Sequence, residues 1–206
     1  MIINDSFPKF DLPIDFIADD SITGDILNYY SNFPCKIKAG VFVLCTEGMV
    51  KATINLLEVV IRKNDFVIVL PNSFIQIHEV SSDTRISFAG FSSDFMLSGN
   101  YVEILLDSMP MILNSPVISL QDDIAGLYRN VYLLLIRAYT LPHSLENKDI
   151  IRSILAIFLQ GTKELYKRYG RKLDEPLRRE QELYRQFIQL LMAHYTSEHE
   201  VAFYAE

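Results

Sequence analysis

Residues 41–91 read VFVLCTEGMVKATINLLEVVIRKNDFVIVLPNSFIQIHEVSSDTRISFAGF, and this stretch decides the fold. Short apolar runs recur along it, and Gly, Asn, Asp or Pro residues separate each run from the next. These separators are the residues that tight turns require. Short strands at such regular spacing predict an antiparallel sandwich or small barrel. The expected strands are Val41–Cys45, Met49–Leu56, Val59–Ile61, Phe66–Leu70, Phe74–Val80 and Arg85–Phe91.

On the C-terminal side of this stretch, the apolar spacing changes from that of strands to that of helices. We expect short helical pieces at 94–97 and 101–108 and two long helices, at about 119–139 and 146–169. A third helix begins near Asp174, and residues 183–206 start an apolar pattern without a partner, so they predict the opening of a further domain. On the N-terminal side, residues 1–33 read as an irregular arm or an edge strand packed by its aromatic residues.

The composition is that of a soluble, folded protein. Half of the 206 residues are apolar, and 19 basic against 26 acidic residues give a net charge of -7. This charge argues against nucleic-acid binding by the chain as a whole, although residues 163–185 carry eight basic and five acidic residues. A solvated helix face is the simpler interpretation of that stretch. The sequence has no apolar run of membrane-spanning length and no signal peptide, and its two cysteines read as reduced thiols, so we expect a cytoplasmic protein.

Motifs for catalysis are absent from the sequence. It contains no Gly-rich phosphate loop, no G-x-S-x-G, no H-E-x-x-H and no paired C-x-x-C motif. His194 and His199 are five residues apart, a spacing that places them on different faces of a helix and makes a metal pair improbable. Cys45 lies in an apolar strand and is expected to be a small buried residue. We therefore predict no catalytic residue, no metal, no cofactor and no enzyme activity.

Two segments carry a family resemblance. Gly40-Val-Phe-Val-Leu-Cys-Thr-Glu-Gly48, Ile54-Asn-Leu and Lys63-Asn-Asp-Phe-Val-Ile-Val-Leu-Pro-Asn72 together resemble the sensor domain of AraC-type transcription regulators. Phe187-Ile-Gln-Leu-Leu-Met-Ala-His-Tyr195 with Val201-Ala-Phe-Tyr-Ala-Glu206 is similar to the start of that family's DNA-binding domain.

The resemblance covers about residues 35–206 and implies an α+β fold in three parts. Residues 1–98 would form a cupin-like β-barrel of jelly-roll type with an N-terminal arm, and residues 99–172 a helical dimerisation segment. Residues 173–206 would form a linker and the beginning of a truncated helix-turn-helix domain. The implied partners are DNA, bound through recognition helices absent from this chain, a small-molecule effector and a second copy of the chain in a homodimer of a bacterial regulator.

The sequence departs from metal-binding cupins at the metal motif. Ser73 stands where that motif has Gly, and Gln76 stands where it has His, so the metal site of cupin enzymes is missing. Gln76 and His78 share one face of their strand, and Ile75 and Ile77 share the other. Either face can point inward. If the Gln face does, the residues predicted to line an effector pocket are Phe42, Leu44, Thr53, Gln76, His78 and Phe88. If the isoleucines point inward, Gln76 and His78 are surface groups.

The apolar stripes of the two long helices predict the dimer interface, because these helices are apolar around much of their girth. The expected interface residues are Leu127, Val131, Leu135, Ile154 and Phe158, and charged replacements of Leu135 and Phe158 are expected to give monomers. The favoured function is the sensor and dimerisation region of a regulator. The alternatives are a stand-alone ligand-binding module and, less favoured, a cupin enzyme.

Overall fold

The computed structural model describes residues 9–10, 12, 14–28, 31, 33–97, 101–140 and 148–169, and, toward the C-terminus, 179, 183, 186–187, 190, 194, 198 and 200–204. Its strands form two five-stranded sheets that face each other as a sandwich. Sheet A has the order β1-β3-β8-β5-β6, and sheet B has the order β10-β7-β4-β9-β2. The strands are β1 (Lys9–Phe10), β2 (Phe16–Thr23), β3 (Cys35–Ile37), β4 (Gly40–Glu47), β5 (Met49–Ile54), β6 (Leu57–Arg62), β7 (Asp65–Val69), β8 (Ser73–Val80), β9 (Arg85–Phe91) and β10 (Val117–Ser119).

The predicted α+β class and the six predicted strands are confirmed, with one correction. The described strands belong to two separate sheets that do not close into a barrel. The chain crosses between the sheets, because β4, β7 and β9 lie in sheet B while β5, β6 and β8 lie in sheet A. The expected edge strand at the N-terminus is β2, which pairs with β9 at one edge of sheet B.

Tight turns connect the consecutive strands from β4 to β8, and each of these four turns contains a residue in the left-handed region. Asn55, Asn64 and Asn72 have φ values of 53°, 67° and 68°, and Gly48 has a φ of 76°. Asn tolerates this conformation better than other non-glycine residues. At Gly48 a side chain is also excluded by space, because a Cβ atom would lie 2.6 Å from the Cα of Thr84.

Strand β7 contributes to two separate apolar cores, one inside the sandwich and one between sheet B and the helices. All five of its residues are buried, because β7 packs on both faces. Val67 and Val69 face sheet A, in the core of the sandwich, with Val50, Ile54 and Ile86 among their neighbours. Phe66 and Ile68 face the opposite way, in a second core between sheet B and the helices. Sheet B is therefore the central layer of the molecule.

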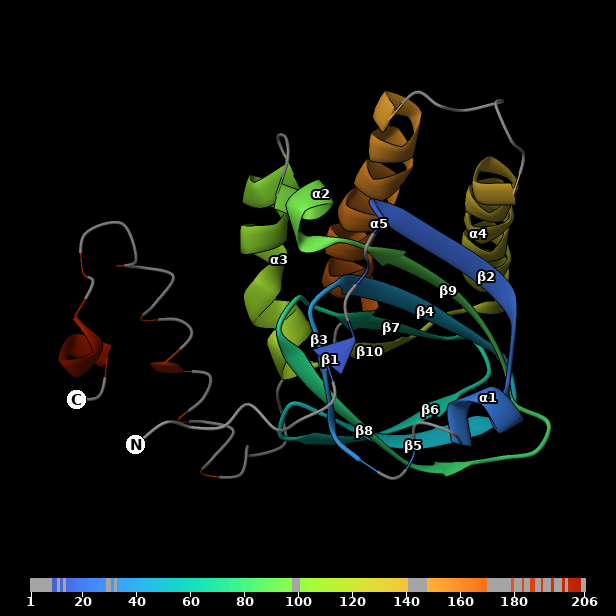
Figure 1. Cartoon of the computed structure of the whole chain (residues 1–206), viewed down its shortest axis with the longest axis horizontal. Helices are drawn as coiled ribbons and strands as arrows, with labels where there is room; N and C mark the ends of the chain where they lie inside the picture. The colour runs from blue at the N-terminus through green and yellow to red at the C-terminus, as the bar shows by residue number, and fades with distance from the viewer. Residues whose placement is uncertain are drawn as a thin grey trace.

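Helices α4 (Asp122–Thr140) and α5 (Lys148–Tyr169) cover the outer face of sheet B, and α3 (Tyr101–Asn114) packs against α5. Figure 1 shows α5 between α3 and α4, with the strands of sheet A on the far side of the sandwich. Helix α4 begins with Asp122 and Asp123, which suit the positive end of the helix dipole. Its length and that of α5 agree with the two long helices expected from sequence. The helices are α1 (Gly24–Asn28), α2 (Ser93–Leu97), α3 (Tyr101–Asn114), α4 (Asp122–Thr140), α5 (Lys148–Tyr169) and the 3-10 helix η1 (Val201–Tyr204). Most of the predicted third helix, from Asp174, lies outside the described residues.

Candidate functional site

Two of the predicted effector residues, Phe42 and Leu44, belong to the core between sheet B and the helices. Phe42 is 1% exposed, and its ring stacks on Phe158 of α5 with centroids 5.1 Å apart. The alternation of β4 sends Val41 and Val43 into the sandwich and Phe42 and Leu44 toward the helices. Their side chains therefore hold α5 on the sheet.

Three other predicted effector residues, Thr53, Gln76 and His78, lie on the outer face of sheet A. Ile75 and Ile77 pack into the sandwich core, so of the two open alternatives the structure has the one with the isoleucines inward. Thr53 pairs with Gln76 across the strands, and its hydroxyl lies 2.7 Å from Nε2 of the exposed His78. Phe88, the sixth residue, is half-buried and lies beside Gly90 on β9. The six residues do not share one wall, and a ligand role for them stays a prediction.

The predicted dimer residues also divide into two groups. Leu135 and Phe158 are fully buried and Ile154 is 3% exposed, all within the core that joins the helices to sheet B. They are committed to packing within the chain, so charged replacements there would unfold the protein instead of separating two subunits. Leu127, by contrast, is 58% exposed, and Val131 is only partly buried.

A pocket of about 170 Å³ lies between α4 and the end of sheet B where β2, β9 and β4 run side by side. The strands contribute one polar residue each, and the helix contributes a cation, a phenol and an aliphatic side chain. The pocket is open to solvent through its exposed charged residues. Its lining residues are Asp20, Thr46, Ser87, Arg129, Tyr132 and Leu133.

Two β-bulges shape the strand side of this pocket. In β2 the pairing with β9 skips from Asp19–Phe88 to Ile22–Ile86, so Asp20 and Ser21 together stand opposite Ser87. In β4 it skips from Cys45–Ile86 to Glu47–Arg85, which leaves Thr46 as the extra residue. Bulges redirect side chains and are enriched beside functional sites. Both bulges here flank the same point of β9, and each supplies a lining residue.

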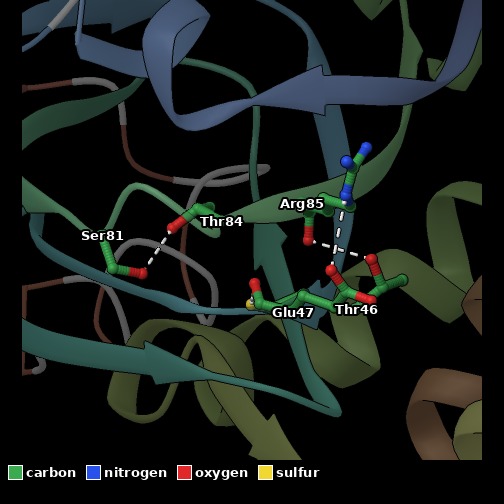
Figure 2. A network of polar contacts seen from close by, with 6 residues as sticks. Thr46, Glu47, Ser81, Thr84 and Arg85 are labelled. Atoms are coloured by element: carbon green, nitrogen blue, oxygen red, sulfur yellow. Dashed lines mark hydrogen bonds and ion pairs between the residues drawn. The ribbon is translucent and has the colours of Figure 1, made fainter.

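Hydrogen bonds fix the position of Thr46. Its hydroxyl donates to the carbonyl oxygen of Arg85 at 3.0 Å, and the adjacent Glu47 forms an ion pair of 3.4 Å with Arg85 (Figure 2). Figure 2 also shows the bond of 2.9 Å between the hydroxyls of Ser81 and Thr84 in the turn that precedes β9. The Glu47–Arg85 pair is exposed and adds little stability. The hydrogen bonds nevertheless hold the ends of β4 and β9 in register below α4.

The polar side chains of the pocket have unused bonding capacity. Asp20 and Arg129 both line it, and within the described part of the chain no ion pair joins them to each other or to another residue. Tyr132 is fully buried, and its hydroxyl has no hydrogen-bond partner among the residues that the structure describes. Burial, and secondarily nearby Tyr128, raises the pKa of Tyr132 well above its usual range. Tyr132 therefore remains a neutral hydrogen-bond donor.

An exposed apolar strip lies on the other flank of α4 and on the adjoining flank of α5. Leu127, Val131 and Leu134 follow each other at helical spacing on α4, and Leu134 is 48% exposed. Ile150 and Ile157 do the same on α5, where Ile157 is 51% exposed. Gly161 continues the α5 row and lets the Tyr128 hydroxyl of α4 approach closely, so this flank of α5 faces α4. We call these five residues, Leu127, Val131, Leu134, Ile150 and Ile157, the helix strip.

Sequence reasoning missed all six pocket residues, although a signal was present. On the helix-facing side of each strand, one polar residue interrupts an apolar series: Asp20 follows Ala18, Thr46 follows Leu44, and Ser87 precedes Ala89. These three polar residues on three neighbouring strands mark a place where the outer face of sheet B is not covered by apolar packing alone. Their convergence depends on the order β4-β9-β2, which the sequence does not reveal.

Among the described residues, no group of three His, Cys, Asp or Glu side chains is arranged to hold a metal ion. None of the helices in that part of the chain is both long enough and apolar enough to cross a membrane.

Comparisons with known proteins were made for sequence and for structure. No protein-family model matches the chain, and no curated protein matches it by sequence. Among solved structures, the chain is similar to the AraC-like transcriptional activator CuxR, with 11% identity over 92% of this chain and 61% of that one and a TM-score of 0.45. It is also similar to ToxT from Vibrio cholerae, with 13% identity over 93% of this chain and 70% of that one and a TM-score of 0.41. The EutQ protein of Clostridium difficile matches 43% of the chain, at 14% identity and a TM-score of 0.28, and 71% of its own length is covered.

Proposed function

We propose that this chain is the sensor and dimerisation region of an AraC-type transcription regulator. The observation that carries the proposal is the double use of helix α4. One flank of α4 closes the polar pocket on sheet B, and the other flank carries three of the five residues of the exposed helix strip. A sensor needs a ligand site and an interface joined by one rigid element, and in this proposal α4 has that role.

The spacing of side chains on α4 supports this arrangement. Arg129 and Leu133 lie on the flank next to β2, and Leu127 and Leu134 lie on the flank next to α5. Between them, Tyr128, Tyr132 and Leu135 are buried against sheet B and α5. A ligand that changes the position of the Tyr132 side chain would rotate or shift α4 against sheet B. The same movement would change the position of the helix strip.

In this proposal the helix strip is the contact between two copies of the chain. Dimerisation would bring two DNA-binding units to a spacing that depends on the pocket. Residues 1–98 would form the sensor, residues 99–172 the dimerisation segment, and residues 173–206 the connection to helix-turn-helix units that contact DNA in the bacterial cytoplasm. The chain itself would catalyse no reaction.

Sedimentation equilibrium of the purified chain tests the interface. We expect a dimer for the wild type and monomers for Leu127→Glu and Leu134→Glu, because each change buries a charge in an apolar contact. Asn130→Glu, on the exposed side of the same helix, is the matched control and should remain dimeric. Circular dichroism checks that all variants are folded. A dimer that survives both leucine changes would show that the strip is not the interface.

A reporter assay tests dimerisation of the chain inside cells. The chain would be fused to a monomeric DNA-binding domain whose repression requires dimerisation. Repression that is lost with Leu134→Glu and retained with Asn130→Glu would support the proposal. A monomeric wild-type chain that gives no repression would overturn it and favour the stand-alone binding module.

A further inference from the structure

We propose that the pocket below α4 binds a small zwitterion of the α-amino acid type, with a side chain no larger than that of alanine or serine. This inference rests on the proposed sensor function and adds the chemical class of its ligand. Three properties of the pocket carry it: its volume, its pair of opposite charges and its hydroxyl groups.

The volume limits the size of the ligand. A pocket of about 170 Å³ has the volume of about six water molecules in the liquid, so it accommodates about six non-hydrogen atoms. Pockets for drug-sized ligands are larger, from about 300 Å³ upward. Sugars, nucleotides and aromatic metabolites are therefore too large to enter fully. A small amino acid has the right size.

The charges select a ligand that carries both signs. Asp20 and Arg129 line the same small pocket, and neither forms an ion pair in the part of the chain described. A simple anion would pair with Arg129 but would be repelled by Asp20. A simple ammonium ion would pair with Asp20 but would be repelled by Arg129. A zwitterion can place its carboxylate on the planar fork of Arg129 and its ammonium on Asp20. It satisfies both groups and brings no net charge into the pocket.

The hydroxyl groups complete the recognition of such a ligand. Tyr132 lines the pocket, and its buried hydroxyl, which has no acceptor among the described residues, would donate to a carboxylate oxygen of a ligand that reaches it. Ser87 is 3% exposed and offers a second hydroxyl from the central strand. The Thr46 hydroxyl already donates its proton to the carbonyl oxygen of Arg85, so the hydroxyl oxygen remains available to accept a hydrogen bond from an ammonium group. Leu133 supplies the aliphatic wall for a short side chain.

Thermal denaturation of the chain with added ligand tests this inference. We expect L-alanine and L-serine to raise Tm in a saturable way, and propionate and ethylamine, which each lack one charged group, to have no such effect. L-phenylalanine tests the size limit and should also have no effect. Arg129→Gln and Asp20→Asn should each weaken the apparent affinity at least tenfold. Arg137→Gln on α4 and Asp25→Asn on α1 are the exposed matched controls and should bind as the wild type does.

The possible outcomes separate the inference from the proposed function. Equal shifts with propionate or ethylamine, or shifts that persist unchanged in Arg129→Gln and Asp20→Asn, would overturn the zwitterion. The absence of a saturable shift with either small amino acid would overturn it as well. None of these results changes the sedimentation of the Leu127 and Leu134 variants, which tests the dimeric sensor independently.

Discussion

At the scale of single residues, Cys45 illustrates how burial controls chemistry. Burial, and secondarily the charge of Asp65, raises the pKa of the Cys45 thiol to about 11 from its usual value of 9.0. The folded chain therefore holds this proton more tightly than the unfolded chain does. The resulting contribution to stability is complete below pH 9 and is lost as the pH rises from 9 to 11. At its largest it amounts to roughly 2–3 kcal/mol.

Urea denaturation at pH 8.5 and pH 10.5 measures this loss. We expect the free energy of unfolding to fall less between these two pH values in Cys45→Val than in the wild type, because valine cannot ionise. With Cys35→Ser as background, a thiol reagent should modify Cys45 only as fast as the chain unfolds. Rapid modification of the native chain at pH 8 would contradict the buried, protonated thiol.

At the scale of elements, two glycines in neighbouring helices predict opposite effects of the same substitution. Gly126 of α4 has open space where a Cβ atom would lie, whereas a Cβ on Gly161 of α5 would lie 2.3 Å from the Tyr128 hydroxyl. Gly126→Ala should therefore stabilise the chain by about 0.5–1 kcal/mol, the usual gain inside a helix. Gly161→Ala should destabilise it, because it forces α4 and α5 apart. Thermal and urea unfolding measure both changes.

A double-mutant cycle identifies the cause of the second effect. Tyr128→Phe removes the oxygen that opposes the new Cβ, and it also removes a buried hydroxyl that has no hydrogen-bond partner in the described part of the chain. Gly161→Ala should then cost less in the Tyr128→Phe background than in the wild type, with a coupling of about 0.5–3 kcal/mol. Additive effects would show that the two helices do not meet at this point.

The elements also show what the sequence could and could not predict. Strands β4 to β9 follow from their alternation and their turn residues, and α4 and α5 follow from their apolar stripes and their acidic first turns. From sequence, residues 1–33 read as an irregular arm or an edge strand, and β2 does not stand out because Asp19, Asp20 and Ser21 interrupt its alternation where the bulge lies. The pocket was missed for the same reason, since it exists only where bulges on two strands meet one helix. The sequence identifies Leu135, Ile154 and Phe158 as apolar. Only the position of sheet B shows that their side chains are buried within the chain and are not available to a second subunit.

At the scale of the whole molecule, sheet B links the two cores. Phe42 and Phe66 face the helices, while their neighbours Val43 and Val67 in the same strands face the sandwich. Neither core can open without disturbing strands that the other core needs. We expect the described part of the chain to unfold as one cooperative unit.

Matched substitutions in the two cores test this expectation. Phe158→Ala on the helix side should cost about 3–5 kcal/mol, and Ile61→Ala on the sandwich side about 2–5 kcal/mol. Each should move the far-ultraviolet and tyrosine signals to the same lower midpoint. Separate midpoints for the two signals in Phe158→Ala would show that the helices unfold independently of the sandwich.

The bulge at Thr46 has a consequence for how such a chain can diversify. Because Cys45 and Glu47 pair with the consecutive residues Ile86 and Arg85, loss of the single codon for Thr46 would leave a regular ladder with every other partner unchanged. The hairpin would survive, and one hydroxyl would disappear from the pocket. The bulge in β2 allows the same kind of change at Asp20 or Ser21. The lining of this pocket can therefore evolve through one-residue insertions and deletions inside strands as well as through substitutions.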